Sequence, residues 1–296
     1  RRVIRVGVAG WSYADWKGRV YPRSGGRNFH PLPYLAQYFD CIEINSSFYA
    51  PPNPSHVRAW VDHVEPFRDF RFCIKLHRDF THGQISEQDA LVFRRTFEPM
   101  QDCGKLGVAL AQFHQGFAND AEGRSKLARV QRLAGSLPLV VEMRHKSWFF
   151  GDALRYLEEE GVNLAHIDMP ASPEVVPQVV ERKSLPYVVG PIGYLRVHGR
   201  NDEDWYNPEK DRDDKYNWLY SEEDSALFAR YAQRLANEAG DTYVVTNNHF
   251  GGKAAANGVQ IKHTLEGDLV SAPPELVATY PSLTAITKRE GQQQLF

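Results

Sequence analysis

Eight short runs rich in Val, Ile, Leu and Phe recur along the chain, and this repeat restricts its fold more than any other feature. The runs are Val3–Val8, Cys41–Asn45, Arg71–Leu76, Gly107–Gln112, Leu139–Met143, Asn163–Asp168, Gly193–His198 and Tyr243–Asn247. Segments with helical spacing of apolar residues lie between them: Ser55–Val64, Glu87–Met100, Ser125–Leu137, Asp152–Glu160 and Ser221–Ala239. Because strands that alternate with helices form parallel sheets, we expect an α/β fold.

The number of these runs, together with the chain length, favours one architecture. Eight strand–helix units in 296 residues match a single (β/α)8 TIM barrel, whose usual size is about 250 residues. A doubly wound sheet is the alternative, but the first run lacks the Gly-x-Gly-x-x-Gly turn that a dinucleotide site requires. Because no linker or low-complexity tract divides the chain, we expect one domain over residues 1–285 and a C-terminal tail over 286–296.

Composition excludes several classes of protein. The net charge of −2 is unlike that of a broadly basic nucleic-acid binder, although it permits a local basic patch. No apolar run approaches the ~20 residues that cross a bilayer, so we expect no membrane association. Three cysteines without a Cys-x-x-Cys motif favour a reducing cytoplasm over a disulfide scaffold or a thiolate zinc site.

Polar residues gather where the expected strands end, which in a TIM barrel is the catalytic face. Residues two apart on a strand point to the same side. Four such pairs are Glu43 with Asn45, Glu142 with Arg144, His166 with Asp168, and Arg196 with His198. If that side is the barrel lumen, carboxylates, imidazoles and guanidiniums converge at one mouth, where they can perform acid–base chemistry. An ion-pair network that closes the top of the barrel is the structural alternative.

Three sets of candidate residues follow from this convergence. The predicted catalytic residues are Glu142, Asp168, His198 and Glu43. The predicted substrate-binding residues are Trp11, Asn45, Tyr49, Lys75, Arg144, Trp148, Arg196, Asn247 and Asn248. The predicted metal ligands are His77 and His114, together with Glu142, Asp168 and His198. Nitrogen and oxygen ligands of this kind suit a divalent metal such as zinc or manganese, whereas hydrogen-bonded pocket histidines are the alternative.

Two further segments indicate a ligand and a partner. The stretch Asn247–Lys253 is either a phosphate site at a helix N-terminus or an ordinary glycine turn. The last five residues, Gln292–Phe296, read Gln-Gln-Gln-Leu-Phe and resemble the Gln-x-x-Leu-Phe peptide with which many bacterial DNA-processing proteins bind the sliding clamp. The sliding clamp is therefore an expected partner, with a frayed end as the alternative.

A series of motifs resembles one family, in order over nearly the whole chain. They are Gly10-Trp11-Ser12-Tyr13, Glu43-Ile44-Asn45-Ser46-Ser47-Phe48-Tyr49, Phe72-x-x-Lys75, Glu142-x-Arg144-x-x-Ser147-Trp148, Arg196-x-His198-Gly199-Arg200 and Asn247-Asn248. With these motifs the chain resembles the YecE-like proteins, known as domain-of-unknown-function family 72. The resemblance implies a TIM barrel, and it implies no particular reaction because the biochemical function of that family is not established.

The strand-end residues favour an enzyme, either a hydrolase or a lyase, that acts on a phosphate-bearing or nucleic-acid-related substrate. Glu142 and Asp168 would be acid–base or metal carboxylates, while Lys75 and the strand-end arginines would hold the anion. One alternative is a sugar isomerase or glycoside hydrolase that uses Glu43 and Glu142 as its carboxylate pair. Another is a non-catalytic module that binds nucleic acid and reaches the sliding clamp through its tail.

Overall fold

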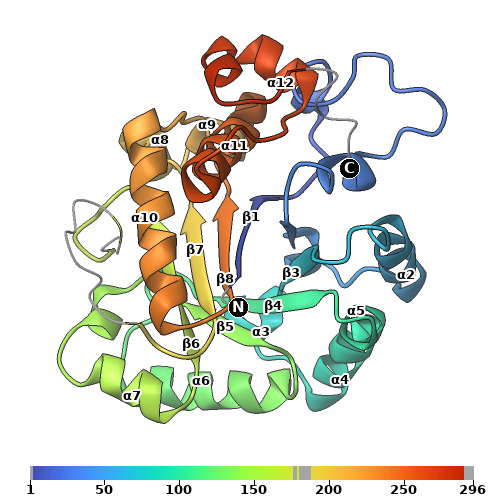
Figure 1. Ribbon diagram of the computed structural model, residues 1–296. Coiled ribbons are helices and arrows are strands. Elements are labelled where there is room, and N and C mark those ends of the chain that lie inside the picture. Colours follow the sequence, from blue (N-terminus) through green and yellow to red (C-terminus); the bar gives the residue numbers. More distant parts are fainter. Residues whose placement is uncertain (1–2, 176–178, 180–187, 290–296) are drawn as a thin grey trace.

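Eight parallel strands close into a barrel in chain order, with β8 paired to β1 (Figure 1). The computed structural model describes residues 3–175, 179 and 188–289. The strands are β1 (Ile4–Ala9), β2 (Cys41–Ile44), β3 (Arg71–Lys75), β4 (Leu106–Gln112), β5 (Leu139–Glu142), β6 (Asn163–Asp168), β7 (Gly193–Val197) and β8 (Thr242–Thr246). The TIM barrel is confirmed, and every strand begins and ends within one residue of its predicted bound.

Helices surround the barrel, as Figure 1 shows. The α-helices are α1 (Pro31–Leu35), α2 (Pro54–His63), α3 (Arg78–Thr81), α4 (Glu87–Thr96), α5 (Glu98–Asp102), α6 (Ala121–Ala134), α7 (Ala153–Glu159), α8 (Asp202–Trp205), α9 (Arg212–Lys215), α10 (Glu222–Glu238), α11 (Lys253–Glu266) and α12 (Pro274–Thr279). Short 3-10 helices are η1 (Ala14–Trp16), η2 (Ser46–Phe48), η3 (Lys146–Phe149), η4 (Phe250–Gly252) and η5 (Pro281–Ala285).

Two helices differ from their predictions. The helix expected over Ser125–Leu137 lies at Ala121–Ala134, because the Asp120 side chain accepts from the Gly123 N–H and caps it earlier in the chain. The expected helix Glu87–Met100 is divided at Phe97 into α4 and α5. Pro99 lies in the first turn of α5 and has no amide hydrogen to continue the bonding of α4, so the chain starts a new helix there. In the described residues, no helix combines the length and apolar composition that a membrane crossing requires.

Inward and outward side chains alternate along the strands, and this alternation determines which polar residues enter the lumen. Side chains of alternate residues enter the lumen, where Cys41, Cys73 and Val140 belong to one buried apolar cluster. The inward residues two positions later along the same strands are Glu43, Lys75 and Glu142. The lumen is therefore apolar toward the amino ends of the strands and polar at their carboxyl ends.

The outward faces of β7 and β8 pack against α10, which lies beside them in Figure 1. After η5 the chain still lies against the barrel body, because Val270 donates to Ile286 over 3.1 Å and accepts from Lys288 over 2.9 Å. The folded body thus continues to Lys288, slightly beyond the predicted end at residue 285. The predicted clamp-binding peptide, Gln292–Phe296, lies outside the described residues.

Candidate active site

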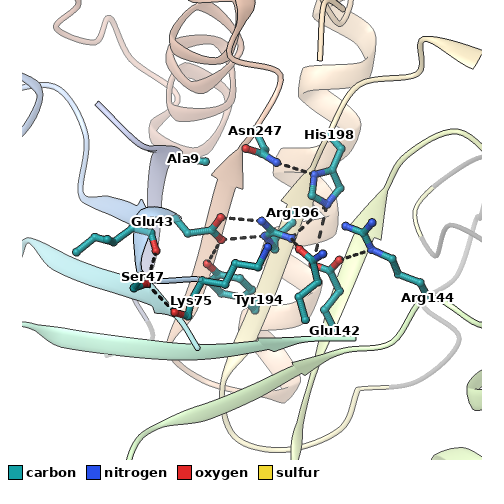
Figure 2. Close-up of polar contacts among 12 residues, drawn as sticks. Ala9, Glu43, Ser47, Lys75, Glu142, Arg144, Tyr194, Arg196, His198 and Asn247 are labelled. Carbon is teal, nitrogen blue, oxygen red and sulfur yellow. Dashed lines mark hydrogen bonds and ion pairs between the residues drawn. The ribbon is translucent and has the colours of Figure 1, made fainter. Parts of the chain in front are cut away.

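Arg196 lies at the centre of the polar layer, between two buried carboxylates (Figure 2). It comes from β7 and is 1% exposed, while Glu43 of β2 and Glu142 of β5 have no exposed surface. Its Nη2 and Nε donate to Glu43 Oε1 and Oε2 over 2.7 and 2.8 Å, and its Nη1 donates to Glu142 Oε2. One guanidinium thereby connects three strands that are not neighbours in the barrel.

Each carboxylate has a second donor. Tyr194 donates its hydroxyl hydrogen to Glu43 Oε2 over 2.6 Å, and Arg144 Nε donates to Glu142 Oε1 over 2.7 Å. Burial by itself would raise the pKa of Glu142, but Arg196 and Arg144 outweigh it and hold that pKa far below its usual range. All four carboxylate oxygens therefore accept hydrogen bonds, and the two glutamates form the ion-pair network that was the structural alternative.

His198 lies beside this network and is fully buried. Its Nδ1 accepts a hydrogen bond of 2.9 Å from Asn247, and its Nε2 is 3.4 Å from Arg196 Nη1 and 4.0 Å from Glu142 Oε2. Burial, followed by repulsion from Arg196, lowers the pKa of His198 well below its ordinary value. The imidazole is therefore neutral at pH 7, and in this arrangement it positions Asn247.

A cavity of about 260 Å³ opens above the network, at the carboxyl ends of the strands. Its lining is polar and aromatic: Tyr13, Asn45, Phe48, Tyr49, Lys75, His82, Gln112, Arg196, Tyr216, Asn247 and His249. The predicted binding residues that the structure brings together here are Asn45, Tyr49, Lys75, Arg196 and Asn247. The convergence expected at the strand ends is thus present for these side chains.

Lys75 lines this cavity. In the described part of the chain, its amine forms no ion pair with a carboxylate. Ser47 Oγ donates to the backbone carbonyl of Lys75 over 2.6 Å, which anchors the residue at the end of β3. Its Nζ lies 4.0 Å from the centroid of the Phe48 ring. Burial, followed by repulsion from Arg196 and Arg144, lowers the pKa of Lys75 to about 7. Near neutral pH, the amine is therefore partly uncharged.

Three other predicted binding residues serve packing instead. Trp148 is fully buried, where its Nε1 donates to the Phe117 carbonyl over 2.8 Å and its ring stacks on Phe117. Trp11 packs edge-on against Trp60 of α2, with ring centroids 5.3 Å apart. Asn248 is fully buried and donates to a loop carbonyl and to a side chain of α11. Aromatic and amide residues of the βα loops thus hold those loops against the barrel.

Asp168, which was predicted to be a catalytic residue, does not line the cavity. His166 and Asp168 share a face of β6, as predicted, but this face points outward. His166 Nδ1 is 2.8 Å from the Tyr231 hydroxyl of α10, while Asp168 accepts hydrogen bonds from Arg200 over 2.8 Å and Tyr220 over 2.6 Å. The period of two identified the pair correctly without indicating which side of the strand is inward. Asp168 therefore joins β6 to the segments around α10, away from the cavity.

The five predicted metal ligands do not form one group, although His198 Nε2 lies 4.0 Å from Glu142 Oε2. His77 accepts from the backbone N–H of Asp79 over 3.3 Å at the start of α3, and its Nε2 is 3.3 Å from the Tyr49 carbonyl oxygen. His114 faces His82, with ring centroids 5.4 Å apart. In residues 3–175, 179 and 188–289, no group of three or more His, Cys, Asp or Glu side chains is arranged to hold a metal ion.

The predicted anion site at Asn247–Lys253 is a glycine turn. Gly251 and Gly252 have φ values of 67° and 83°, which glycine adopts at little cost. The Gly251 N–H, which a phosphate would need, already donates to Asp15 Oδ2 over 2.6 Å. A carboxylate of the chain itself therefore occupies this position.

Three tyrosines of the site, Tyr13, Tyr194 and Tyr216, were not among the predicted residues. Tyr194 lies two positions before Arg196 on β7, so the same period-two argument would have placed it in the lumen. Tyr216 comes from the long charged segment after β7, and its ring centroid is 5.2 Å from that of His249. No local pattern distinguishes Tyr216, because its position depends on how that segment folds over the barrel.

Several known proteins are similar to this chain over most of its length. UPF0759 protein YunF of Bacillus subtilis is 26% identical over 283 residues, which cover 89% of this chain and 95% of YunF. UPF0759 protein YecE of Escherichia coli K12 is 29% identical over 178 residues, covering 56% of this chain and 59% of YecE.

Solved structures are also similar to this chain over most of its length. A DUF72 family protein from Thermotoga maritima has a TM-score of 0.74 and 30% identity, covering 89% of this chain and 99% of that one. Another from Enterococcus faecalis has a TM-score of 0.75 and 25% identity, covering 89% and 96%. The family model described as "Protein of unknown function DUF72" matches residues 5–278. The resemblance to YecE-like proteins is thereby confirmed, and the chain belongs to the DUF72 family.

Proposed function

We propose that the chain is a cytoplasmic enzyme, a hydrolase or lyase, that acts on a small phosphate-bearing or similarly anionic substrate in the cavity at the barrel mouth. The observation that carries this proposal is the cavity-facing amine of Lys75, which has no carboxylate partner in the described residues. The cytoplasmic location is supported by three free cysteines, of which Cys103 is exposed.

The charges around the cavity favour an anionic ligand. Arg196 and Arg144 are offset by Glu43 and Glu142, so these four groups are together neutral. When Lys75 is protonated, the cluster carries one uncompensated positive charge. A phosphate or carboxylate group beside Lys75 would neutralise that charge and raise the pKa of the lysine, since an opposite charge favours the protonated form.

The size and lining of the cavity favour a small molecule. A volume of about 260 Å³ is near the lower end of ordinary ligand pockets. Asn45 Oδ1 is buried and has no hydrogen-bond partner in the described part of the chain, so it is a ready acceptor for a substrate hydroxyl. Gln112 and Asn247 add amide groups, and Phe48 adds an aromatic wall. We therefore favour a small phosphate-bearing substrate over a nucleic-acid strand.

The alternatives receive less support. A glycoside hydrolase would need one glutamate to give up a proton and the other to attack or activate water. Here Glu43 and Glu142 are both occupied by Arg196, and Arg144 adds a second cation to Glu142. A role for Gln292–Phe296 in binding the sliding clamp is independent of this cavity and stays a prediction.

Calorimetric titration with inorganic phosphate and with dihydroxyacetone phosphate, near pH 6.5, tests the proposal. Lys75→Met should bind at least one of these anions about 10- to 100-fold more weakly than the wild-type protein, as expected when a charge-assisted hydrogen bond is lost. Lys17→Met, at an exposed position, should bind like the wild type. Equal affinity in Lys75→Met, or no binding of either anion, would refute the proposal.

A further inference from the structure

We propose that the amine of Lys75 forms a covalent imine with its substrate, which therefore carries a carbonyl group as well as an anionic group. This inference rests on the proposed function and specifies the substrate class for the same cavity. It also favours a lyase over a hydrolase, because a protonated imine withdraws electrons from the neighbouring carbon atoms.

An imine-forming lysine needs an accessible nitrogen whose lone pair is not engaged elsewhere. Two other lysines with little exposed surface, Lys105 and Lys262, do not meet this condition. Lys105 Nζ donates to the Phe67 carbonyl over 2.5 Å, and Lys262 Nζ donates to Asp40 Oδ1 over 2.8 Å. Lys75 instead lines the cavity, with its Nζ over the face of Phe48 and no acceptor in the described part of the chain.

The surroundings of Lys75 supply the free amine that the reaction requires. Two guanidiniums, those of Arg196 and Arg144, disfavour a third positive charge nearby, and burial acts in the same direction. A lysine that is desolvated beside another cation is a recognised arrangement for nucleophilic catalysis. Because both arginines are held in place by carboxylates, this electrostatic environment is rigid.

The step balances without any further reactant. The Nζ lone pair forms a bond to the carbonyl carbon, and the carbonyl π electrons move onto oxygen. That oxygen takes up the two protons that the nitrogen gives up, directly or by relay through a neighbouring hydroxyl, and leaves as water. An ammonium and a carbonyl thus become a protonated imine and water. The single positive charge at Lys75 is conserved, and the anionic group of the substrate offsets it in both states.

A proton donor for the departing oxygen lies in the same cavity. Tyr216 lines it, and burial raises the pKa of the Tyr216 hydroxyl, which therefore stays protonated at neutral pH. Gln112 and Asn247 line the same space and provide amide donors for the carbonyl oxygen before it leaves. These groups orient a carbonyl toward Lys75 without using the two buried glutamates.

Reductive trapping tests the inference. The full-length protein is incubated near pH 7 with pyruvate or dihydroxyacetone phosphate in the presence of cyanoborohydride, followed by intact-mass measurement and peptide mapping. We expect at least one probe to add a single substrate, less its carbonyl oxygen, at Lys75. Lys75→Arg should give no adduct because it keeps the charge but lacks the amine, whereas Lys17→Met should be labelled like the wild type.

The outcomes separate this inference from the proposed function. If the wild-type protein binds the probes in calorimetry but neither becomes attached, the imine is refuted while the anionic site stands. If an adduct forms equally in Lys75→Arg or maps to another lysine, the imine at Lys75 is likewise refuted. If neither binding nor labelling occurs, both proposals fail. An adduct confined to Lys75 supports both.

Discussion

Replacing Lys75 with Met should stabilise the protein, and the gain should depend on pH. In the folded state, burial and the neighbouring arginines lower the pKa of Lys75 from 10.5 to about 7. Lys75 therefore binds more protons in the unfolded chain than in the folded chain between pH 7 and 10.5, and its contribution to stability rises with pH across that window. The destabilisation by Lys75 is greatest below pH 7 and disappears above pH 10.5. Methionine, which has no charge, removes it while filling a similar volume.

The size of this effect follows from the two pKa values. Lowering the pKa from 10.5 to about 7 corresponds to at most about 5 kcal/mol at pH 6 and to about 2 kcal/mol at pH 9. The Lys75 amine borders a cavity that admits water, so the measured gain should be smaller than this upper bound. A difference of about 1 to 3 kcal/mol between the two pH values is the expected result.

Urea denaturation at pH 6 and pH 9, followed by circular dichroism, measures the effect. The wild type is compared with Lys75→Met and with the exposed control Lys17→Met. We expect a higher free energy of unfolding for Lys75→Met, with the larger gain at pH 6, and no pH-dependent gain for the control. A loss of stability in Lys75→Met at pH 6, or an equal gain at both pH values, would refute the reasoning.

Three further predictions concern buried polar groups. Arg196→Met leaves Glu43 and Glu142 without their shared cation and should cost about 3–5 kcal/mol in urea denaturation; a loss below about 1 kcal/mol would contradict the network's role. Tyr194→Phe removes one donor to Glu43 and should cost about 1–2 kcal/mol in the same assay, so an unchanged midpoint would argue against this hydrogen bond. Burial lowers the pKa of His166 from 6.5 to about 4, so the unfolded chain binds more protons in that range and stability falls as pH decreases. His166→Asn should reduce this loss by up to about 3 kcal/mol between pH 7 and pH 4, and an unchanged pH dependence of unfolding would count against it.

Prediction from the sequence succeeded for the elements whose formation depends on local pattern. Each strand is a short apolar run, and its bounds follow from where that run stops. The same pattern predicted that carboxylates and guanidiniums would converge at one mouth of the barrel, and Glu43, Glu142 and Arg196 do so because inward-facing residues near strand ends share one layer.

The site predictions failed where residue type was used without knowledge of orientation. Asp168 has the right spacing from His166 and stands at a strand end, yet it points outward, where it accepts from Tyr220. Trp148 follows β5 as a substrate-binding aromatic would, yet it is buried against Phe117. The pattern of alternation in β6 is ambiguous because both faces of a parallel barrel strand are buried, so hydrophobicity does not distinguish them.

The sequence by itself determined the barrel, its eight strands and the family, because these depend on periodicity and on motifs that are local in the chain. Only the tertiary structure decided which charges neutralise one another. Arg196 lies more than 150 positions from Glu43 along the chain, and its pairing with both glutamates is what leaves Lys75 without a partner. The reactivity of a lysine depends on such distant neighbours and on exclusion of water, and neither is present until the barrel closes.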